Sequence, residues 1–281
     1  MEQKPNYIVT ENPALVRLLA TRHLNGISGK YVLGFVIYYL IEEWVPNLLS
    51  LVFPGVLPLE SMLGSTAELV GQIPQIPVVY MVYMTLLGGA LCLGRTLYVM
   101  TVLRNRQVEY GVLLEGMPFY FKATLIYLIQ MILFGLGLGL FIVPGVYLFY
   151  TFSQALFIFA DDPNLSVIDC LRKSRQMMRG NVFSMIKVDL MYVSLILFGY
   201  IPMIVVNYIE PVQVNTLLGM LTWLILRITV YAGLSNLYLG RATFYELMKC
   251  GGFRNFRFAG EKDFREAMKA QSGYPPANRR K

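Results

Sequence analysis

The segment DDPNLSVIDCLRKSRQMMRGN, residues 161–181, is a short polar stretch between two long apolar runs, and the order of the fold follows from it. Asp162 and Pro163 are typical of a helix cap and first helical position, and Gly180 is typical of a helix end. At about 100° per residue, the apolar side chains gather with Ser174 on one arc of this helix, namely Val167, Cys170, Leu171, Met177 and Met178. The sequence therefore predicts an amphipathic helix between two membrane spans.

The opposite side of this helix carries four cations, Arg172, Lys173, Arg175 and Arg179. A basic amphipathic helix next to membrane spans is expected to lie in the lipid interface. Each cation near an anionic leaflet contributes on the order of 1 kcal/mol. Two interpretations remain open: the charges only fix the topology, or this face binds lipid headgroups or a protein partner.

The composition is that of a membrane protein. Of 281 residues, 56% are hydrophobic and only 15% are charged, against about 25% charged in soluble domains. Runs near the roughly 20 residues that a span requires predict six transmembrane helices, at 31–53, 78–103, 121–143, 146–160, 182–206 and 215–239, with a turn at Pro144-Gly145. The expected fold is an all-α, polytopic domain over residues 1–252, followed by a basic, partly disordered tail over 253–281.

The Lys and Arg residues predict the orientation. The segments before the first span, from Arg104 to Lys122 at the start of the third span, between the fourth and fifth, and after the sixth carry 4, 3, 4 and 10 of them, whereas the intervening segments carry none. By the positive-inside rule, both termini are cytoplasmic in a bacterial plasma membrane. Because the net charge of +7 is distributed in this way, we expect no nucleic-acid partner.

A second capped helix is expected between Asn12-Pro13 and Asn25-Gly26, ahead of the first span. With the basic segments before the third and fifth spans, it suggests a threefold unit of one amphipathic segment and two spans. Shared biophysics is the alternative explanation of this pattern. Two pairs of small residues, Ala90 with Gly94 and Gly135 with Gly139, are expected to let helices pack closely in lipid.

Charged residues inside spans are functional candidates because they are costly in lipid. At 1.5 Å per residue, Arg95 and Asp189 lie roughly 10–12 Å from the cytoplasmic side, and Glu42, Glu43 and Arg227 lie roughly 18–20 Å deep. These levels predict that Arg95 pairs with Asp189, and Arg227 with Glu42 or Glu43. The two glutamates lie either inside one long span or at the interface of a shorter one. The pairs either lock helices together or line a polar cavity.

Signals of catalysis are thin. The single histidine, His23, is expected to be a solvated residue of an interfacial helix. No His, Cys or acidic cluster has metal-ligand spacing, and no serine has a nucleophile-elbow context. Asp161-Asp162 are explained by helix capping or, alternatively, by cation binding. We expect neither an enzyme nor a cofactor.

Four stretches carry a family resemblance: VPG at 143–145, FIFADDPNLS at 157–166, SRQMMRGN at 174–181 and ATFYE at 242–246. Together they resemble a family of bacterial integral membrane proteins, common in Firmicutes and catalogued as domain of unknown function 975. The similarity covers most of residues 17–249. More distantly, the chain is similar to the membrane domain of some glycerophosphodiester phosphodiesterases, whose catalytic domain has no counterpart here. The resemblance implies a multi-span membrane protein without an established activity.

Two functions remain after these exclusions. One is a non-enzymatic scaffold or accessory protein whose basic segments contact anionic lipid headgroups or a membrane partner. The other is a transporter or permease for a small solute or lipid that uses the buried Arg–acid pairs. The oligomeric state is not predictable from the sequence.

Overall fold

The computed structural model describes residues 7–53, 55, 77–209 and 217–252, and every regular element in these ranges is a helix. Five helical stretches are long and apolar enough to cross a membrane, namely Ser28–Val52, Val78–Asn105, Tyr110–Leu140, Ile142–Asp161 and Val182–Pro202. The predicted all-α fold is confirmed. The sixth predicted span, 215–239, overlaps α11 (Leu217–Cys250), and its crossing of the membrane stays a prediction. The predicted tail, 253–281, lies outside the described residues.

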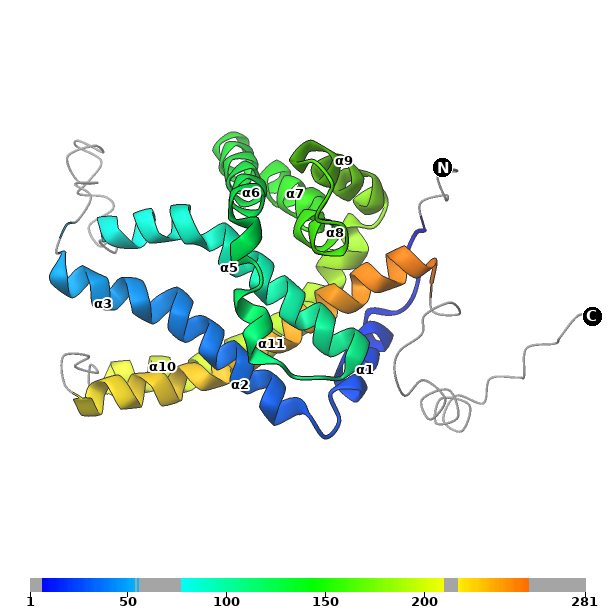
Figure 1. Cartoon of the computed structure of the whole chain (residues 1–281). Helices are drawn as coiled ribbons and strands as arrows, with labels where there is room; N and C mark the ends of the chain where they lie inside the picture. Colours follow the sequence, from blue (N-terminus) through cyan, green and yellow to red (C-terminus); the bar gives the residue numbers. More distant parts are fainter. Residues whose placement is uncertain (1–6, 54, 56–76, 210–216, 253–281) are drawn as a thin grey trace, which may run out of the picture.

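In Figure 1, α2 (Ser28–Tyr39), continued by α3 (Val45–Val52), runs in roughly the same direction as α5 (Val78–Asn105). Helix α10 (Val182–Ile209) lies along α11, and these two helices cross the first pair in this view. Helix α11 is central, because it packs against α1 (Pro13–His23), α2, α5 and α10. Helices α6 (Tyr120–Leu140) and α7 (Ile142–Phe152) form a pair, in which α6 contacts α5. The short helices α8 (Ala155–Asp161) and α9 (Val167–Met178) follow them.

The first span is uninterrupted. A π-helical turn, Leu40–Trp44, joins α2 directly to α3 and carries both Glu42 and Glu43. Pro46 follows in the first turn of α3, where its missing N–H breaks no regular bond of that helix. Of the two alternatives, the structure favours a single span that contains the two acids.

The turn between the third and fourth spans is not at Pro144-Gly145, so that prediction is wrong. Helix α6 ends at Leu140, and α7 begins at Ile142 after the extended residue Phe141. Proline is well tolerated in the first turn of a helix, so Pro144 starts the fourth span instead of ending the third. Gly145 lies against Gly137 of α6, where a Cβ on Gly137 would come within 2.6 Å of the Gly145 Cα.

The start of the amphipathic helix also differs from the prediction. Asp162 does not cap it: the Asp162 carboxylate accepts the Asn164 N–H at 3.2 Å within a turn. Ser166 is the cap of α9, because its hydroxyl accepts the Asp169 N–H at 3.2 Å and also donates to the Asp169 carboxylate at 2.6 Å. This reciprocal pair satisfies more polar groups than Asp162-Pro163 can. The predicted end is confirmed, with Gly180 at a φ of +87°.

The capped helix expected after Asn12-Pro13 is present as α1, and its amphipathic role at a membrane surface stays a prediction. The Asn12 side chain accepts the Ala14 N–H at 2.9 Å, and Gly26 ends the segment at a φ of +85°. The segment before α6 is different, because it consists of two short 3₁₀ turns, Tyr110–Leu114 and Met117–Phe119. The threefold unit therefore stays a hypothesis about order along the chain.

The small-residue pairs behave differently from one another. Gly94 lies against the backbone of Leu113, and Gly116 lies against the carbonyl of Ala90, so the first pair does permit close packing. Gly135 and Gly139 have no atoms within 4 Å of an added Cβ among the described residues, so they make no such contact inside the chain. Large apolar side chains are also exposed on the outer faces of α6 and α10, including Phe121, Leu136, Leu197 and Phe198. Such faces are expected of a protein surrounded by lipid.

An aromatic cluster holds α2 to α5. The rings of Tyr31 and Tyr98 stack with centroids 5.7 Å apart, and Phe35 meets Tyr98 edge-on at 6.1 Å. The Tyr98 hydroxyl donates to the Tyr31 carbonyl at 3.0 Å, and the Tyr31 hydroxyl donates to the Ser235 carbonyl of α11 at 2.8 Å. This arrangement satisfies buried polar atoms while three helices are packed together.

The N-terminal segment is bound to the start of α10. The Val9 N–H donates to the Asn181 side-chain oxygen at 2.8 Å, and the Asn181 amide donates to the Tyr7 carbonyl at 2.9 Å. The Ser184 hydroxyl donates to the Val9 carbonyl at 3.1 Å. We call this three-bond contact the N-terminal clasp. It fixes the approach to α1, which packs against α10 and α11.

Candidate functional site

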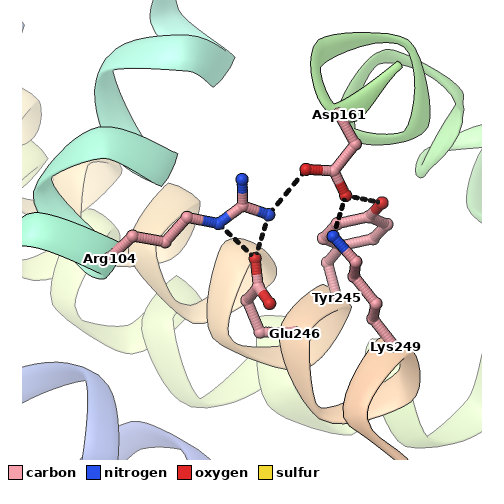
Figure 2. A network of polar contacts seen from close by, with 5 residues as sticks. All are labelled: Arg104, Asp161, Tyr245, Glu246 and Lys249. Atoms are coloured by element: carbon pink, nitrogen blue, oxygen red, sulfur yellow. Dashed lines mark hydrogen bonds and ion pairs between the residues drawn. The ribbon is translucent and has the colours of Figure 1, made fainter. Parts of the chain in front are cut away.

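The most concentrated group of polar side chains joins the ends of three helices (Figure 2). Arg104, at the end of α5, donates from Nη2 to Asp161 Oδ1 at 2.7 Å and from Nε to Glu246 Oε1 at 2.8 Å. The other oxygen of Asp161 accepts from the Tyr245 hydroxyl at 2.5 Å and from Lys249 Nζ at 2.7 Å. We call these five residues the polar network, and the end of the bundle that contains them and α9 the basic end.

The helix geometry explains why these side chains meet. Tyr245, Glu246 and Lys249 lie within one turn of α11, with residues 245 and 249 one above the other. Helix α8 packs against α5, so its last residue, Asp161, faces Arg104. The carboxylates of Asp161 and Glu246 are only 12% and 11% exposed. Two cations offset two anions, so the network is a neutral, half-buried connection between three helices.

An open pocket of about 430 Å³ lies beside the polar network. Its charged and phenolic lining consists of Tyr7, Asp161, Asp162, Lys173, Tyr245 and Lys249, and its apolar lining consists of Ile158, Leu165, Met177 and Met248. The pocket thus takes residues from the N-terminal segment, α8, α9 and α11. Its size falls within the range of small-ligand sites.

Helix α9 displays the predicted basic face. Cys170, Ser174 and Met178 are buried, and the Ser174 hydroxyl donates to the Thr151 carbonyl of α7 at 2.9 Å. The four predicted cations, Arg172, Lys173, Arg175 and Arg179, are exposed. The Arg172 side chain is 65% exposed and is 3.0 Å from the Asp169 carboxylate. Burial and the nearby Asp169 carboxylate raise the pKa of the Cys170 thiol, although Lys173 opposes this change, so the thiol stays protonated. The α9 basic face is therefore a firmly anchored, accessible surface.

The predicted pairing of Arg95 with Asp189 is wrong. Asp189 is held by Arg241, with Nη2 at 2.6 Å, and by the Tyr150 hydroxyl at 2.9 Å. Depth along a span fixes the level of a residue but not the helix that it faces. Asp189 lies on α10, which packs closely against α11 and therefore against Arg241.

Arg95 instead lies among aromatic rings. Its guanidinium carbon is 3.8 Å from the centroid of the Tyr238 ring and 5.0 Å from that of Tyr38. It also donates to the Tyr38 hydroxyl at 3.2 Å, and Glu42 attracts it electrostatically. Cation–π contacts are strong where water is excluded, so the rings stabilise a charge that Asp189 does not offset.

The second predicted pairing is confirmed. Arg227 Nη1 lies 3.6 Å from Glu43 Oε1, and the Tyr231 hydroxyl donates to Glu43 at 3.0 Å. Of the two acids, Glu43 is thus the partner of Arg227, whereas Glu42 interacts with Arg95. Both contacts connect the first span to another helix.

His23 is not a solvated residue, contrary to the prediction. It is only 7% exposed at the end of α1. Burial, together with the positive charge of Arg106, lowers the pKa of His23 to about 4. The imidazole is therefore neutral at neutral pH.

The sequence interpretation missed the polar network and Arg241. From the sequence, Arg104, Arg241 and Lys249 are only charges that set the topology, and helix capping or cation binding accounts for Asp161. One signal was available: Tyr245 and Glu246 belong to the ATFYE stretch that carries the family resemblance, yet they had no assigned role. Charged residues continuing past the end of a predicted span, at helical spacing, indicate a buried contact at the membrane edge.

Within residues 7–53, 77–209 and 217–252, no three His, Cys, Asp or Glu side chains are grouped as metal ligands. Comparisons with protein-family models, with curated proteins and with solved structures find no match to this chain.

Proposed function

We propose that the chain is a non-enzymatic accessory protein of the bacterial plasma membrane that holds anionic lipid headgroups at its basic end. The observation that carries this proposal is the exposed basic face of α9, anchored from behind by Cys170, Ser174 and Met178. Because the helix backbone is already ordered, only the side chains of these cations lose conformational freedom when headgroups bind. By the positive-inside rule, the charge distribution predicts that this end and both termini are cytoplasmic, where the leaflet is anionic.

The experiment is native mass spectrometry of the full chain in detergent with an equimolar mixture of phosphatidylglycerol and phosphatidylcholine. We expect the wild type to retain phosphatidylglycerol preferentially, and the double substitution Arg172→Gln/Arg175→Gln to reduce this preference. The matched control is Lys30→Gln/Lys187→Gln, which removes the same charge at two exposed positions outside α9.

Equal losses in the two double variants would show that net charge, and not the α9 basic face, attracts the lipid, and the proposal would be wrong. If a protein co-purifies with the wild type and is lost only from the α9 variant, the ligand of the α9 basic face is a membrane protein and not a lipid headgroup. Either result is read from the same spectra.

A second function, transport of a small solute or lipid, is supported by one observation. Arg95 is a half-buried cation whose hydrogen bond to Tyr38 and ring contacts are with neutral groups. Among the described residues, the one carboxylate that attracts it, Glu42, forms no ion pair with it, so an anionic solute would improve its environment. We expect a transporter to show a small-molecule adduct that Arg95→Leu abolishes. The same loss on Arg227→Leu would extend the pathway to the Glu43 level.

A further inference from the structure

The pocket beside the polar network has two kinds of wall. Four of its residues are apolar, Ile158, Leu165, Met177 and Met248. Four are ionised, and their charges balance: Asp161 and Asp162 against Lys173 and Lys249. A ligand that fits both walls carries an apolar part and charges of both signs.

The contacts of each ionised group show which of them are available to a ligand. The Asp161 carboxylate already accepts bonds from Arg104, Tyr245 and Lys249, so it is saturated. Lys249 donates one of the three N–H groups of its ammonium to Asp161, and its side chain is 48% exposed, so the other two can bind a ligand.

Lys173 and Asp162 complete the set. Lys173 is exposed and makes no hydrogen bond or ion pair with any other residue in the described part of the chain. Asp162 is exposed and uses one carboxylate oxygen for the Asn164 N–H, which leaves the second oxygen able to accept. The available groups are thus two ammonium donors and one carboxylate acceptor around a partly apolar hollow.

We propose that this pocket binds the headgroup of a zwitterionic phospholipid of the phosphoethanolamine type. The phosphate oxygens accept from Lys173 and Lys249, and the primary ammonium donates to Asp162. The first carbons of the lipid lie against the apolar wall. This site goes beyond binding of anionic headgroups on the α9 basic face, because it selects a ligand with both charges. It rests on the proposed function only in placing the basic end at the membrane surface.

The test is a lipid titration of the full chain in detergent, followed by native mass spectrometry with phosphatidylethanolamine, phosphatidylcholine and phosphatidylglycerol. We expect Asp162→Asn to weaken phosphatidylethanolamine binding about two- to fivefold, the range that one exposed charge contact provides, and to leave phosphatidylglycerol unchanged. Lys173→Gln weakens both lipids. The control is Glu115→Gln, which removes an exposed carboxylate outside the pocket.

Phosphatidylcholine has no N–H to donate, so we expect it to bind more weakly than phosphatidylethanolamine. Equal binding of these two lipids, or an Asp162→Asn variant indistinguishable from Glu115→Gln, overturns the proposal. All these substitutions are at exposed positions, so the fold is expected to survive them.

Free phosphoethanolamine identifies the source of the headgroup. If it displaces the lipid, the headgroup alone carries the affinity and a soluble source is sufficient. If it does not, the apolar wall is needed and the ligand is a lipid. Loss of phosphatidylglycerol on Arg172→Gln/Arg175→Gln without an effect of Asp162→Asn preserves the proposed function and refutes the pocket. If instead Asp162→Asn weakens phosphatidylethanolamine binding and Arg172→Gln/Arg175→Gln leaves phosphatidylglycerol binding unchanged, the pocket is supported and the proposed function is refuted.

Discussion

Replacing Arg104 by Gln tests whether the polar network stabilises the fold. Arg104 makes both of the hydrogen bonds that the structure shows for Glu246, and it also binds Asp161. Removing one member of a fully buried ion pair costs about 3–5 kcal/mol, whereas exposed pairs contribute about 0–1 kcal/mol. Because Glu246 is 11% exposed and Arg104 is 37% exposed, we expect a loss of about 2 kcal/mol.

The assay is reversible unfolding by SDS in mixed micelles, followed by circular dichroism. Arg172→Gln is the control, since its partner Asp169 is solvated, and it should change the free energy of unfolding by less than about 0.5 kcal/mol. The double variant Arg104→Gln/Glu246→Gln removes the carboxylate that the first change strands, so it should recover about 1 kcal/mol. If the losses of the single variants Arg104→Gln and Glu246→Gln simply add in the double variant, the argument that Arg104→Gln leaves an unpaired buried carboxylate is refuted. The same holds if Arg104→Gln changes the free energy of unfolding no more than Arg172→Gln does.

Three further predictions concern packing, pH and the corrected ion pair. Gly34→Ala would place a Cβ 2.2 Å from the Tyr98 hydroxyl, so we expect a loss of about 1–3 kcal/mol in the same SDS titration. Because the pKa of His23 falls from 6.5 to about 4 on folding, the contribution of neutral His23 to the free energy of unfolding is fully present above pH 6.5. It declines as the pH falls toward 4, by on the order of 1 kcal/mol at pH 5. A pH series of unfolding midpoints measures this decline. Arg241→Leu should make Asp189 reactive toward a carbodiimide, detected by peptide mass spectrometry.

Each of these has a result that contradicts it. Gly29→Ala is the control for Gly34→Ala, because an added Cβ there meets nothing within 4 Å, and equal effects would show that Tyr98 adjusts freely. A His23→Gln variant with the same pH profile as the wild type would exclude His23 as the titrating group. Labelling of Asp189 that rises in Arg95→Leu, but not in Arg241→Leu, would restore the original pairing.

The helices and their order were predictable because apolar length and helix-ending glycines act locally. The stretch before Gly180 and the stretch before Gly26 both end in the left-handed region as expected. The pairing of Arg227 with Glu42 or Glu43 was also predictable, since the sequence puts these residues at the same expected depth with few alternative partners of opposite charge, and the structure selects Glu43.

The polar network could not be predicted in the same way. Asp161, Arg104 and Glu246 are far apart in the sequence, and each has a sufficient local explanation as a cap, a topology charge or a helix-surface residue. Their contact depends on α5, α8 and α11 ending at the same level and on the rotation of each helix about its axis. Hydrophobic length determines neither quantity. Asp189 was assigned to the wrong arginine for the same reason.

The N-terminal clasp has a consequence for biosynthesis. Val9 and its partner Asn181 are separated by 172 positions, so the ribosome synthesises Val9 long before Asn181. Until α10 emerges, the buried face of α1, which includes Val16 and Leu19, has neither α10 nor α11 to cover it. The start of the chain is thus the last part to be secured. A bulky fusion next to residue 7 would leave membrane insertion of the earlier helices unaffected and would instead impair the closing step of assembly.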